Sequence, residues 1–168
     1  MNKIIAITGP TGAGKSTTAK LLCKKFERCV RLDIDRVKHF VETGFVYNDT
    51  PRGVEQWALC VKNVIQLTKN FQAEGYTVII EGYIDLESPG WEDVFRELDV
   101  DAAFLLLCDE KEQQDRNMMR KPEARMEPED IGRHLEYFLP RRENDMFVVK
   151  DSTGETAEET VDWIYDKI

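Results

Sequence analysis

The segment Gly9-Pro10-Thr11-Gly12-Ala13-Gly14-Lys15-Ser16 constrains the fold of this chain more than any other part of its sequence. It meets the pattern G-x-x-x-x-G-K-[ST] in full, with an apolar run before it and the amphipathic stretch Lys15–Phe26 after it. Glycines let backbone N–H groups surround phosphate oxygens without obstruction by a Cβ atom, and a following helix directs its positive N-terminal end at the anion. The sequence therefore predicts a strand, a phosphate-binding loop and a helix at the start of the chain.

The residue types in this loop predict the binding of a purine nucleoside triphosphate with Mg²⁺. Lys15 would neutralise the β- and γ-phosphates, the Ser16 hydroxyl would ligate Mg²⁺, and Thr17 would add a hydroxyl near the α-phosphate. The guanine-recognition motif N-K-x-D of GTPases is absent, so ATP is the expected donor and GTP stays an alternative. The residues expected to bind the nucleotide are Gly9, Thr11, Gly12, Ala13, Gly14, Lys15, Ser16 and Thr17.

Short apolar runs alternate with amphipathic stretches along the rest of the chain. The expected strands are Lys3–Thr8, Cys29–Leu32, Thr77–Glu81, Ala102–Cys108 and Met146–Val149. The expected helices are Lys15–Phe26, Val54–Glu74, Lys111–Arg120, Pro128–Phe138 and Glu155–Ile168. Strands that alternate with helices predict βαβ units and a parallel sheet with right-handed crossovers. One α/β domain is therefore expected over residues 1–168.

Composition excludes several classes of partner. The net charge of −9 argues against nucleic acid, which needs a basic surface, and no apolar run approaches the roughly 18 residues that span a membrane. The stretch after Met1 lacks the length and cleavage site of a signal peptide. Cys23, Cys29, Cys60 and Cys108 form no C-x-x-C motif, which is typical of small core residues in a reducing compartment. A cytoplasmic protein is the expectation.

Two alternating carboxylates follow the second expected strand. Asp33 and Asp35 come at its carboxyl end, and ligands of parallel sheets bind beyond the carboxyl ends of the strands. An accepting hydroxyl needs a carboxylate to orient it and take its proton, and Mg²⁺ needs oxygen ligands, so one aspartate for each task is the functional hypothesis. In the alternative, Asp35 only caps a helix that starts at Arg36, and Asp33 is solvated.

The sequence Leu32-Asp33-Ile34-Asp35-Arg36-Val37-Lys38-His39 resembles the L-D-G-D-N-V-R-H of adenylylsulfate kinases and the D-x-D of shikimate kinases. The chain thus looks like the small P-loop metabolite kinases, a group that includes gluconate kinases and chloramphenicol phosphotransferase. This resemblance implies that Asp35 is the base and Asp33 the metal-side residue. Ile34 replaces a glycine and Lys38 an arginine, and the substrate motifs F-S-P and G-G-R are absent, so no particular acceptor is implied.

The same resemblance implies a three-layer P-loop NTPase fold like that of nucleoside-monophosphate kinases, with five parallel strands in the order 2-3-1-4-5. In such proteins a carboxylate at the end of the third strand reaches the water shell of the metal. Glu81 stands at this place, followed by Gly82 and Tyr83, and competes with Asp33 for the metal role. The alternative is a glutamate at a strand end with no functional role.

Arg116 and Arg120 lie four residues apart on an expected helix, and hence on one face of it. Paired guanidinium groups at this spacing suit a lid, roughly residues 116–128, that closes over ATP and stabilises charge on the transferred phosphoryl group. Alternatively they pair with Glu112 and Asp115 on a solvated surface. Near the C-terminus, Ser152 either borders the adenine ring through its backbone or caps the last helix, with Glu155 completing a capping box.

The longest irregular stretch, residues 43–53, falls where small P-loop kinases bind the phosphate acceptor. Its aromatic and polar side chains could contact a ring-bearing or polyhydroxylated molecule, although Trp57 is interpreted as a core residue. His39 and His134 are too far apart in sequence to propose a metal site. The residues expected on the acceptor side are Asp35, Lys38, Tyr47, Arg52, Glu81 and Tyr83.

Taken together, these features predict a kinase that moves the γ-phosphate of ATP to a hydroxyl of a small molecule. Lys15, Asp35, Arg116 and Arg120 are the expected catalytic residues, with Ser16 and Asp33 at the metal. A nucleoside or nucleotide kinase is an alternative within the enzymes, and a nucleotide-binding regulatory ATPase is one outside them. The expected partner is a small-molecule acceptor, without nucleic acid or membrane, and the expected state is a monomer or a homodimer.

Overall fold

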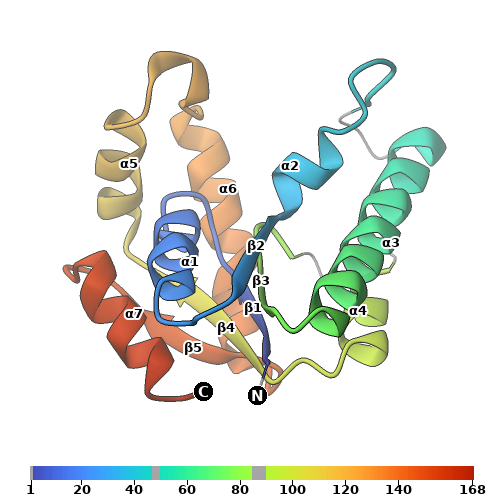
Figure 1. The fold of residues 1–168 in the computed structure, drawn as a ribbon. Coiled ribbons are helices and arrows are strands. Elements are labelled where there is room, and N and C mark those ends of the chain that lie inside the picture. Colours follow the sequence, from blue (N-terminus) through green and yellow to red (C-terminus); the bar gives the residue numbers. More distant parts are fainter. Residues whose placement is uncertain (1, 47–49, 85–89) are drawn as a thin grey trace.

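The structure is a computed structural model that describes residues 2–46, 50–84 and 90–168 (Figure 1). Strands and helices alternate along the chain, as the sequence predicts. The strands are β1 (Ile4–Thr8), β2 (Cys29–Asp33), β3 (Thr77–Glu81), β4 (Ala102–Leu107) and β5 (Val148–Asp151). The helices are α1 (Lys15–Cys23), α2 (Ile34–Lys38), α3 (Pro51–Ala73), α4 (Trp91–Glu97), α5 (Glu110–Met118), α6 (Pro128–Phe138) and α7 (Ala157–Tyr165), with short 3₁₀ helices η1 (Pro122–Ala124) and η2 (Leu139–Glu143).

The five strands form one parallel sheet in the order β2-β3-β1-β4-β5, which confirms the predicted topology. β1 lies in the centre, where Ile5 pairs in register with Ile79 of β3 and with Ala102 of β4. Because all strands run in the same direction, their carboxyl ends meet at one edge of the sheet, where the loop after β1 lies beside the acidic residues that end β2 and β3.

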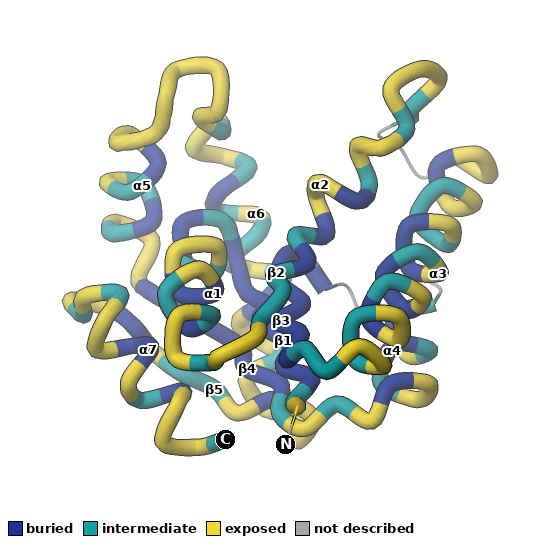
Figure 2. The backbone as a smooth tube through the Cα atoms, viewed as in Figure 1, coloured by how far each residue is buried: buried dark blue, intermediate teal, exposed yellow. Residues whose placement is uncertain are grey.

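Alternating side chains of the strands build two cores. Ile4 and Ala6 belong to a cluster shared with α3, α4 and α6, whereas Ile5 and Ile7 belong to a cluster shared with α1 and α7. Side chains that alternate between the two faces of a strand explain this division. The sheet is therefore buried between two helical layers, as the dark central strands in Figure 2 show. Trp57 packs against the first cluster, as its interpretation as a core residue requires, and Trp91 is fully buried in that cluster.

The end of the chain differs from its prediction. β5 starts two residues later than expected, and the last helix begins at Ala157 rather than at Glu155. Its N-cap is Thr156, which forms a capping box with Glu159, so the proposed box of Ser152 and Glu155 is wrong. The Ser152 hydroxyl is already used, since it donates to the carbonyl of Leu107 at 3.1 Å.

Other boundaries shift in ways that matter for the site. α3 begins three residues earlier than predicted, because Thr50 caps it by accepting from the N–H of Gly53 and Pro51 occupies its first position. α5 ends at Met118, so Arg120 lies beyond the helix rather than on the same helical face as Arg116. The connection from α5 to α6 is exposed from residue 119 to 125 and projects at the top of Figure 1. Among the described helices, none has the length and apolar character that crossing a membrane requires.

Candidate active site

The glycine loop joins β1 to α1 and is held tightly against its neighbours. Gly9 has a φ of 143°, and a Cβ atom there would lie 2.1 Å from the carbonyl oxygen of Leu106. Gly12 has a φ of 86° and would bring a Cβ atom within 2.9 Å of the backbone of Gln113. Glycine is required at both positions by conformation and by space. The loop is thus shaped by β4 and α5 as well as by its own sequence.

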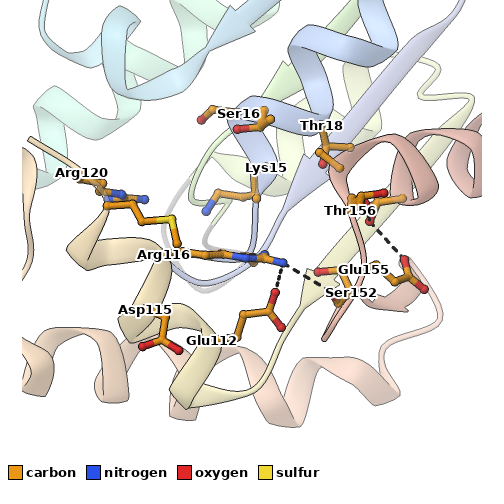
Figure 3. Close-up of a pocket in the computed structure, with 17 residues that line it drawn as sticks. Lys15, Ser16, Thr18, Glu112, Asp115, Arg116, Arg120, Ser152, Glu155 and Thr156 are labelled. Carbon is orange, nitrogen blue, oxygen red and sulfur yellow. Dashed lines mark hydrogen bonds and ion pairs between the residues drawn. The ribbon is translucent and has the colours of Figure 1, made fainter.

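A cavity of about 660 Å³ opens beside this loop (Figure 3). The loop and the start of α1 form one wall, α5 and the residues after it form the second, and the connection from β5 to α7 forms the third. The lining residues include Gly12, Ala13, Gly14, Lys15, Ser16, Thr17, Arg116, Arg120 and Ser152. Eight of the residues expected to bind the nucleotide or act on its phosphates therefore face one cavity of ligand size, whereas Gly9 and Thr11 do not line it.

Lys15 is the point on which charges from several segments converge. Its Nζ donates to the carbonyl of Pro10 at 2.8 Å. Burial lowers the pKa of Lys15 to about 8, the carboxylates of Glu81 and Asp35 oppose this effect, and the guanidinium of Arg120 adds to it. Three segments that are distant in sequence are therefore close enough to act on the same ammonium group.

Glu81 is the buried carboxylate of the site, with only 1% of its surface exposed. It accepts from the Ser16 hydroxyl at 3.0 Å and forms an ion pair with Arg31. Burial, reinforced by the charge of Asp33, raises the pKa of Glu81 above its ordinary value, while Ser16, Arg31 and Lys15 act in the opposite direction. Of the two candidates for the metal role, Glu81 is the one in contact with Ser16.

Asp33 has a structural task at the start of α2. Its side chain accepts from the backbone N–H of Arg36, which makes Asp33, and not Asp35, the N-cap of a helix that starts at Ile34. Asp33 also lies 3.4 Å from the guanidinium groups of both Arg31 and Arg36. The capping alternative proposed for Asp35 is therefore wrong, because the helix begins two residues earlier than expected.

Asp35 lies in the first turn of α2 with its carboxylate 60% exposed. Its Oδ1 atom accepts from Nζ of Lys38 at 2.9 Å, and Lys38 in turn lies over the ring of Trp57, 5.0 Å from its centroid. The carboxylate of Asp35 is therefore open to solvent, and its contact with Lys38 brings together two of the residues expected on the acceptor side.

The two arginines of α5 and the segment after it have different surroundings. Arg116 donates to the carbonyl of Gly12 at 3.1 Å, forms an ion pair with Glu112 and lies 3.5 Å from the carbonyl of Ser152, so it connects all three walls of the cavity (Figure 3). Arg120 is exposed, and within the described part of the chain its guanidinium has no hydrogen bond or ion pair. Arg116 braces the loop, whereas Arg120 is available to a ligand near Lys15.

His134 of α6 was not predicted as part of the site. Its Nδ1 atom lies 2.9 Å from the hydroxyl of Thr11, which also contacts the sulfur of Met126, so Thr11 of the glycine loop points at α6. The ring of His134 packs against Tyr83 with 5.2 Å between centroids. Burial lowers the pKa of His134, as does the nearby Lys15. No local sequence signal marks His134, because 123 residues separate it from Thr11.

The other residues expected on the acceptor side are not all brought to one place. Tyr83 packs into an aromatic cluster with His134, Tyr137 and Phe138. Arg52, at the start of α3, lies over Gly44, where a Cβ atom would meet its guanidinium at 2.4 Å. Tyr47 lies outside the described residues.

The oxygen atoms at Ser16 and Glu81 suit a hard cation. Mg²⁺ is commonly held by one or two protein oxygens together with substrate phosphates and water, rather than by a closed cage of side chains. Residues 2–46, 50–84 and 90–168 contain no cluster of three or more histidine, cysteine or acidic side chains that could hold a metal alone. The donor set therefore fits Mg²⁺ bound with a nucleotide.

Comparison with known proteins adds a family and a fold. A family described as an AAA domain matches residues 5–137, whereas no curated protein matches the sequence. Three solved structures match closely in shape: a sugar kinase from Janibacter sp. HTCC2649 (TM-score 0.71, 14% identity, 99% of this chain and 94% of that chain), the tunicamycin resistance protein of Deinococcus radiodurans (0.70, 17%, 99% and 95%) and thymidylate kinase from Candida albicans (0.64, 15%, 99% and 91%). At these identities the likeness confirms the P-loop kinase fold and leaves the acceptor open.

Proposed function

The chain belongs to the AAA domain family of P-loop proteins, and from this premise we propose that it is an ATP-dependent phosphotransferase that acts on a hydroxyl of a small molecule. The observation that carries the proposal is the convergence of Asp35, Glu81 and Arg120 on Lys15. A protein that only binds a nucleotide needs the lysine and a metal-side carboxylate. An exposed aspartate beside them has a use when a second substrate must lose a proton.

The donor would lie in the cavity beside the glycine loop. Lys15 and Arg120 would neutralise the oxygens of the γ-phosphoryl group, and the backbone N–H groups of residues 12–16 would hold the β-phosphate at the N-terminus of α1. When bound, Mg²⁺ would neutralise part of the phosphate charge, and Ser16 and Glu81 would hold it directly or through water. Arg116 would stabilise the conformation of the glycine loop through its hydrogen bond to the carbonyl of Gly12.

The acceptor would lie between α2 and the end of β3. Asp35 would orient its hydroxyl and take the proton while a bond forms between the hydroxyl oxygen and the γ-phosphorus. The bond from that phosphorus to the oxygen bridging it to the β-phosphate breaks in the same step, and ADP leaves. Because phosphoryl transfer passes through a loose transition state, positioning and charge neutralisation provide most of the rate.

The acceptor's class is decided by experiment rather than by the fold, since a sugar kinase and a thymidylate kinase both share this architecture. We would measure ADP release from ATP·Mg²⁺ with panels of sugars, other metabolite alcohols, nucleosides and nucleotides. If one panel of compounds raises ADP release above the rate measured without an acceptor, the proposal is supported and the class of acceptor is identified. Negligible turnover across all panels, combined with nucleotide binding, favours the regulatory ATPase.

The role of Asp35 is tested with the acceptor found in this way. Asp35→Asn keeps the shape of the side chain but removes the base, so kcat should fall by about 10²-fold or more while ATP affinity is retained. Asp99→Asn, an exposed substitution between α4 and β4, is the matched control and should keep the wild-type rate. Wild-type turnover by Asp35→Asn would show that another group, or none, takes the proton.

A further inference from the structure

Two of the four cysteines lie in contact at the turn that joins α1 to β2. Cys23 is the last residue of α1 and Cys29 the first residue of β2, and their sulfur atoms are 2.8 Å apart. Both are free thiols and both are partly exposed. Their separation exceeds the length of an S–S bond, about 2.05 Å, by less than 1 Å. The two sulfurs are therefore already placed for a bond.

The backbone around the turn holds this arrangement. The N–H of Phe26 donates to the carbonyl of Cys23 at 3.2 Å, and the carbonyl of Arg28 accepts from the N–H of Thr77 at 3.0 Å. The side chains in between are fixed to α7, since Lys25 pairs with Asp162 at 2.8 Å and the ring of Phe26 meets that of Tyr165 edge to face. Backbone hydrogen bonds fix both ends of the turn, and side-chain contacts with α7 fix its middle. The contact between the two sulfur atoms is therefore set by the fold.

We propose that Cys23 and Cys29 form a peroxide-reactive dithiol site, whose oxidation to a disulfide fastens the C-terminal end of α1 to the N-terminal end of β2. This site lies at the edge of the sheet opposite to the glycine loop and belongs to none of the steps of phosphoryl transfer (Figure 1). The proposal stands or falls independently of the proposed function.

The surroundings divide the chemistry between the two thiols. The Cys29 thiol donates to the sulfur of Cys23, which lowers the pKa of Cys23, and the guanidinium of Arg31 lowers it further. The same contact raises the pKa of Cys29. Cys23 is thus the nucleophile and Cys29 the resolving thiol. By contrast, burial raises the pKa of Cys60 and Cys108 to about 11, which makes them inert.

The reaction consumes one peroxide for each disulfide. The Cys23 thiolate attacks an oxygen of hydrogen peroxide, the O–O bond breaks, and with one proton taken up the products are a sulfenic acid and water. The Cys29 sulfur then attacks the Cys23 sulfur, and the S–O bond breaks to release a second molecule of water, for which the Cys29 proton is used. Two thiols are oxidised and the peroxide is reduced to water.

Peptide mapping tests this directly, because Lys24, Lys25 and Arg28 lie between the two cysteines. Trypsin separates residues 21–24 from residues 29–31, so only a disulfide holds these peptides together. After treatment of the folded protein with hydrogen peroxide, blocking of free thiols under unfolding conditions and digestion, we expect the linked pair, with Cys60 and Cys108 fully alkylated. Oxidation of Cys60 or Cys108 at the same rate, or no linked pair, would overturn the proposal.

Single variants assign the roles. In Cys29→Ser, the sulfenic acid of Cys23 has no resolving partner and should be trapped by dimedone, whereas Cys29 in Cys23→Ser should not react. Equal trapping in both variants would contradict the division of roles. Cys60→Ser is the matched control and should still yield the linked pair.

Thermal unfolding of the wild-type protein provides a second measurement that needs no variant to fold. With five residues between the cysteines, the cross-link should raise Tm by about 5 °C over the reduced protein, because it restricts the unfolded chain. Cys23→Ser should show no rise after the same treatment. A lower Tm in the oxidised wild-type protein would mean that the disulfide distorts the turn. This result would contradict the proposal that the native fold accommodates the bond.

Discussion

The donor side and the acceptor side of the candidate site are built in different ways. The donor side is a cavity whose loop is contiguous in sequence, and two of its cations are already held by protein groups, Lys15 by the carbonyl of Pro10 and Arg116 by Gly12 and Glu112. The acceptor side collects single residues from α2, β3 and α6, and Asp35 presents a largely exposed carboxylate. If the proposed function holds, a preformed donor site beside an acceptor side made of separate residues would allow the acceptor to change without change in the phosphate chemistry.

The largest effect should come from the donor side. Replacement of Lys15 by Met removes the charge on which Glu81, Asp35 and Arg120 converge, so kcat should fall by about 10³-fold. Steady-state ADP release and ATP titration by calorimetry measure the two consequences, loss of turnover and weaker binding. Lys24→Met, an exposed change just past the far end of α1, is the control. If Lys15→Met retained turnover within tenfold, the cavity would not be the donor site.

The second effect separates the two arginines. Arg120→Ala should lower kcat by about 10²-fold with little change in stability, because its guanidinium is exposed near Lys15 and is free to contact the transferred group. Arg116→Ala should instead raise the KM for ATP and lower Tm, because it removes the contacts to Gly12, Glu112 and Ser152. The reverse pattern, with Arg116→Ala affecting only kcat, would exchange the two roles.

Much of the fold was predictable because its signals are local. Each strand is a short apolar run and each major helix has apolar residues on one side, so the alternation of elements followed from the sequence, whereas the strand order came from the resemblance to P-loop kinases. The predicted start of the last helix was wrong because two local sequence patterns compete there. Both Ser152-x-x-Glu155 and Thr156-x-x-Glu159 fit a capping box, and the choice is made by tertiary contacts that occupy Ser152 and Glu155, the former at Leu107 and the latter at Lys150.

The site was predictable only where it is contiguous. The glycine loop contains its residues in one stretch, and residues 12–17 line the cavity, while their roles toward a nucleotide stay a prediction. The contact of Ser16 with Glu81 spans 65 residues and that of Thr11 with His134 spans 123, and no sequence periodicity reports such pairs. Asp33 and Asp35 were correctly placed at the strand end, but the capping role considered for Asp35 belongs to Asp33, because the helix starts two residues earlier than the sequence indicated.

The third effect tests which carboxylate serves the metal. Glu81→Gln keeps the shape of the side chain and the contact with Ser16 but removes the charge, so kcat should fall about tenfold and the Mg²⁺ concentration for half-maximal rate should rise. Asp33→Asn is the matched comparison. It should leave the cap of α2 in place, because asparagine caps helices about as well as aspartate, and it should not change the Mg²⁺ requirement. A shifted Mg²⁺ requirement in Asp33→Asn alone would return the metal role to Asp33.

The smallest effect concerns His134, where the two sides meet, since its ring contacts both Thr11 of the donor loop and Tyr83 of the acceptor side. Burial, Lys15 and Arg133 lower the pKa of His134 against the opposing charge of Asp35. Below pH about 6.5 the unfolded chain therefore binds the proton first, and stability declines as the pH falls toward the lowered pKa of the folded state. His134→Asn removes this contribution, so the loss of Tm between pH 7.5 and 5.5 should be smaller by a few degrees.

Activity should follow the same dependence if the contact between Thr11 and His134 keeps the loop in place. We expect the wild-type rate to fall a few-fold more than that of His134→Asn over this pH range, because a protonated His134 repels Lys15 and changes its bond to Thr11. His39→Asn, which changes the other histidine at the exposed end of α2, should keep the wild-type profile. Parallel pH profiles of wild type and His134→Asn would show that the donor and acceptor sides are not coupled through this residue, and that α6 only covers the loop.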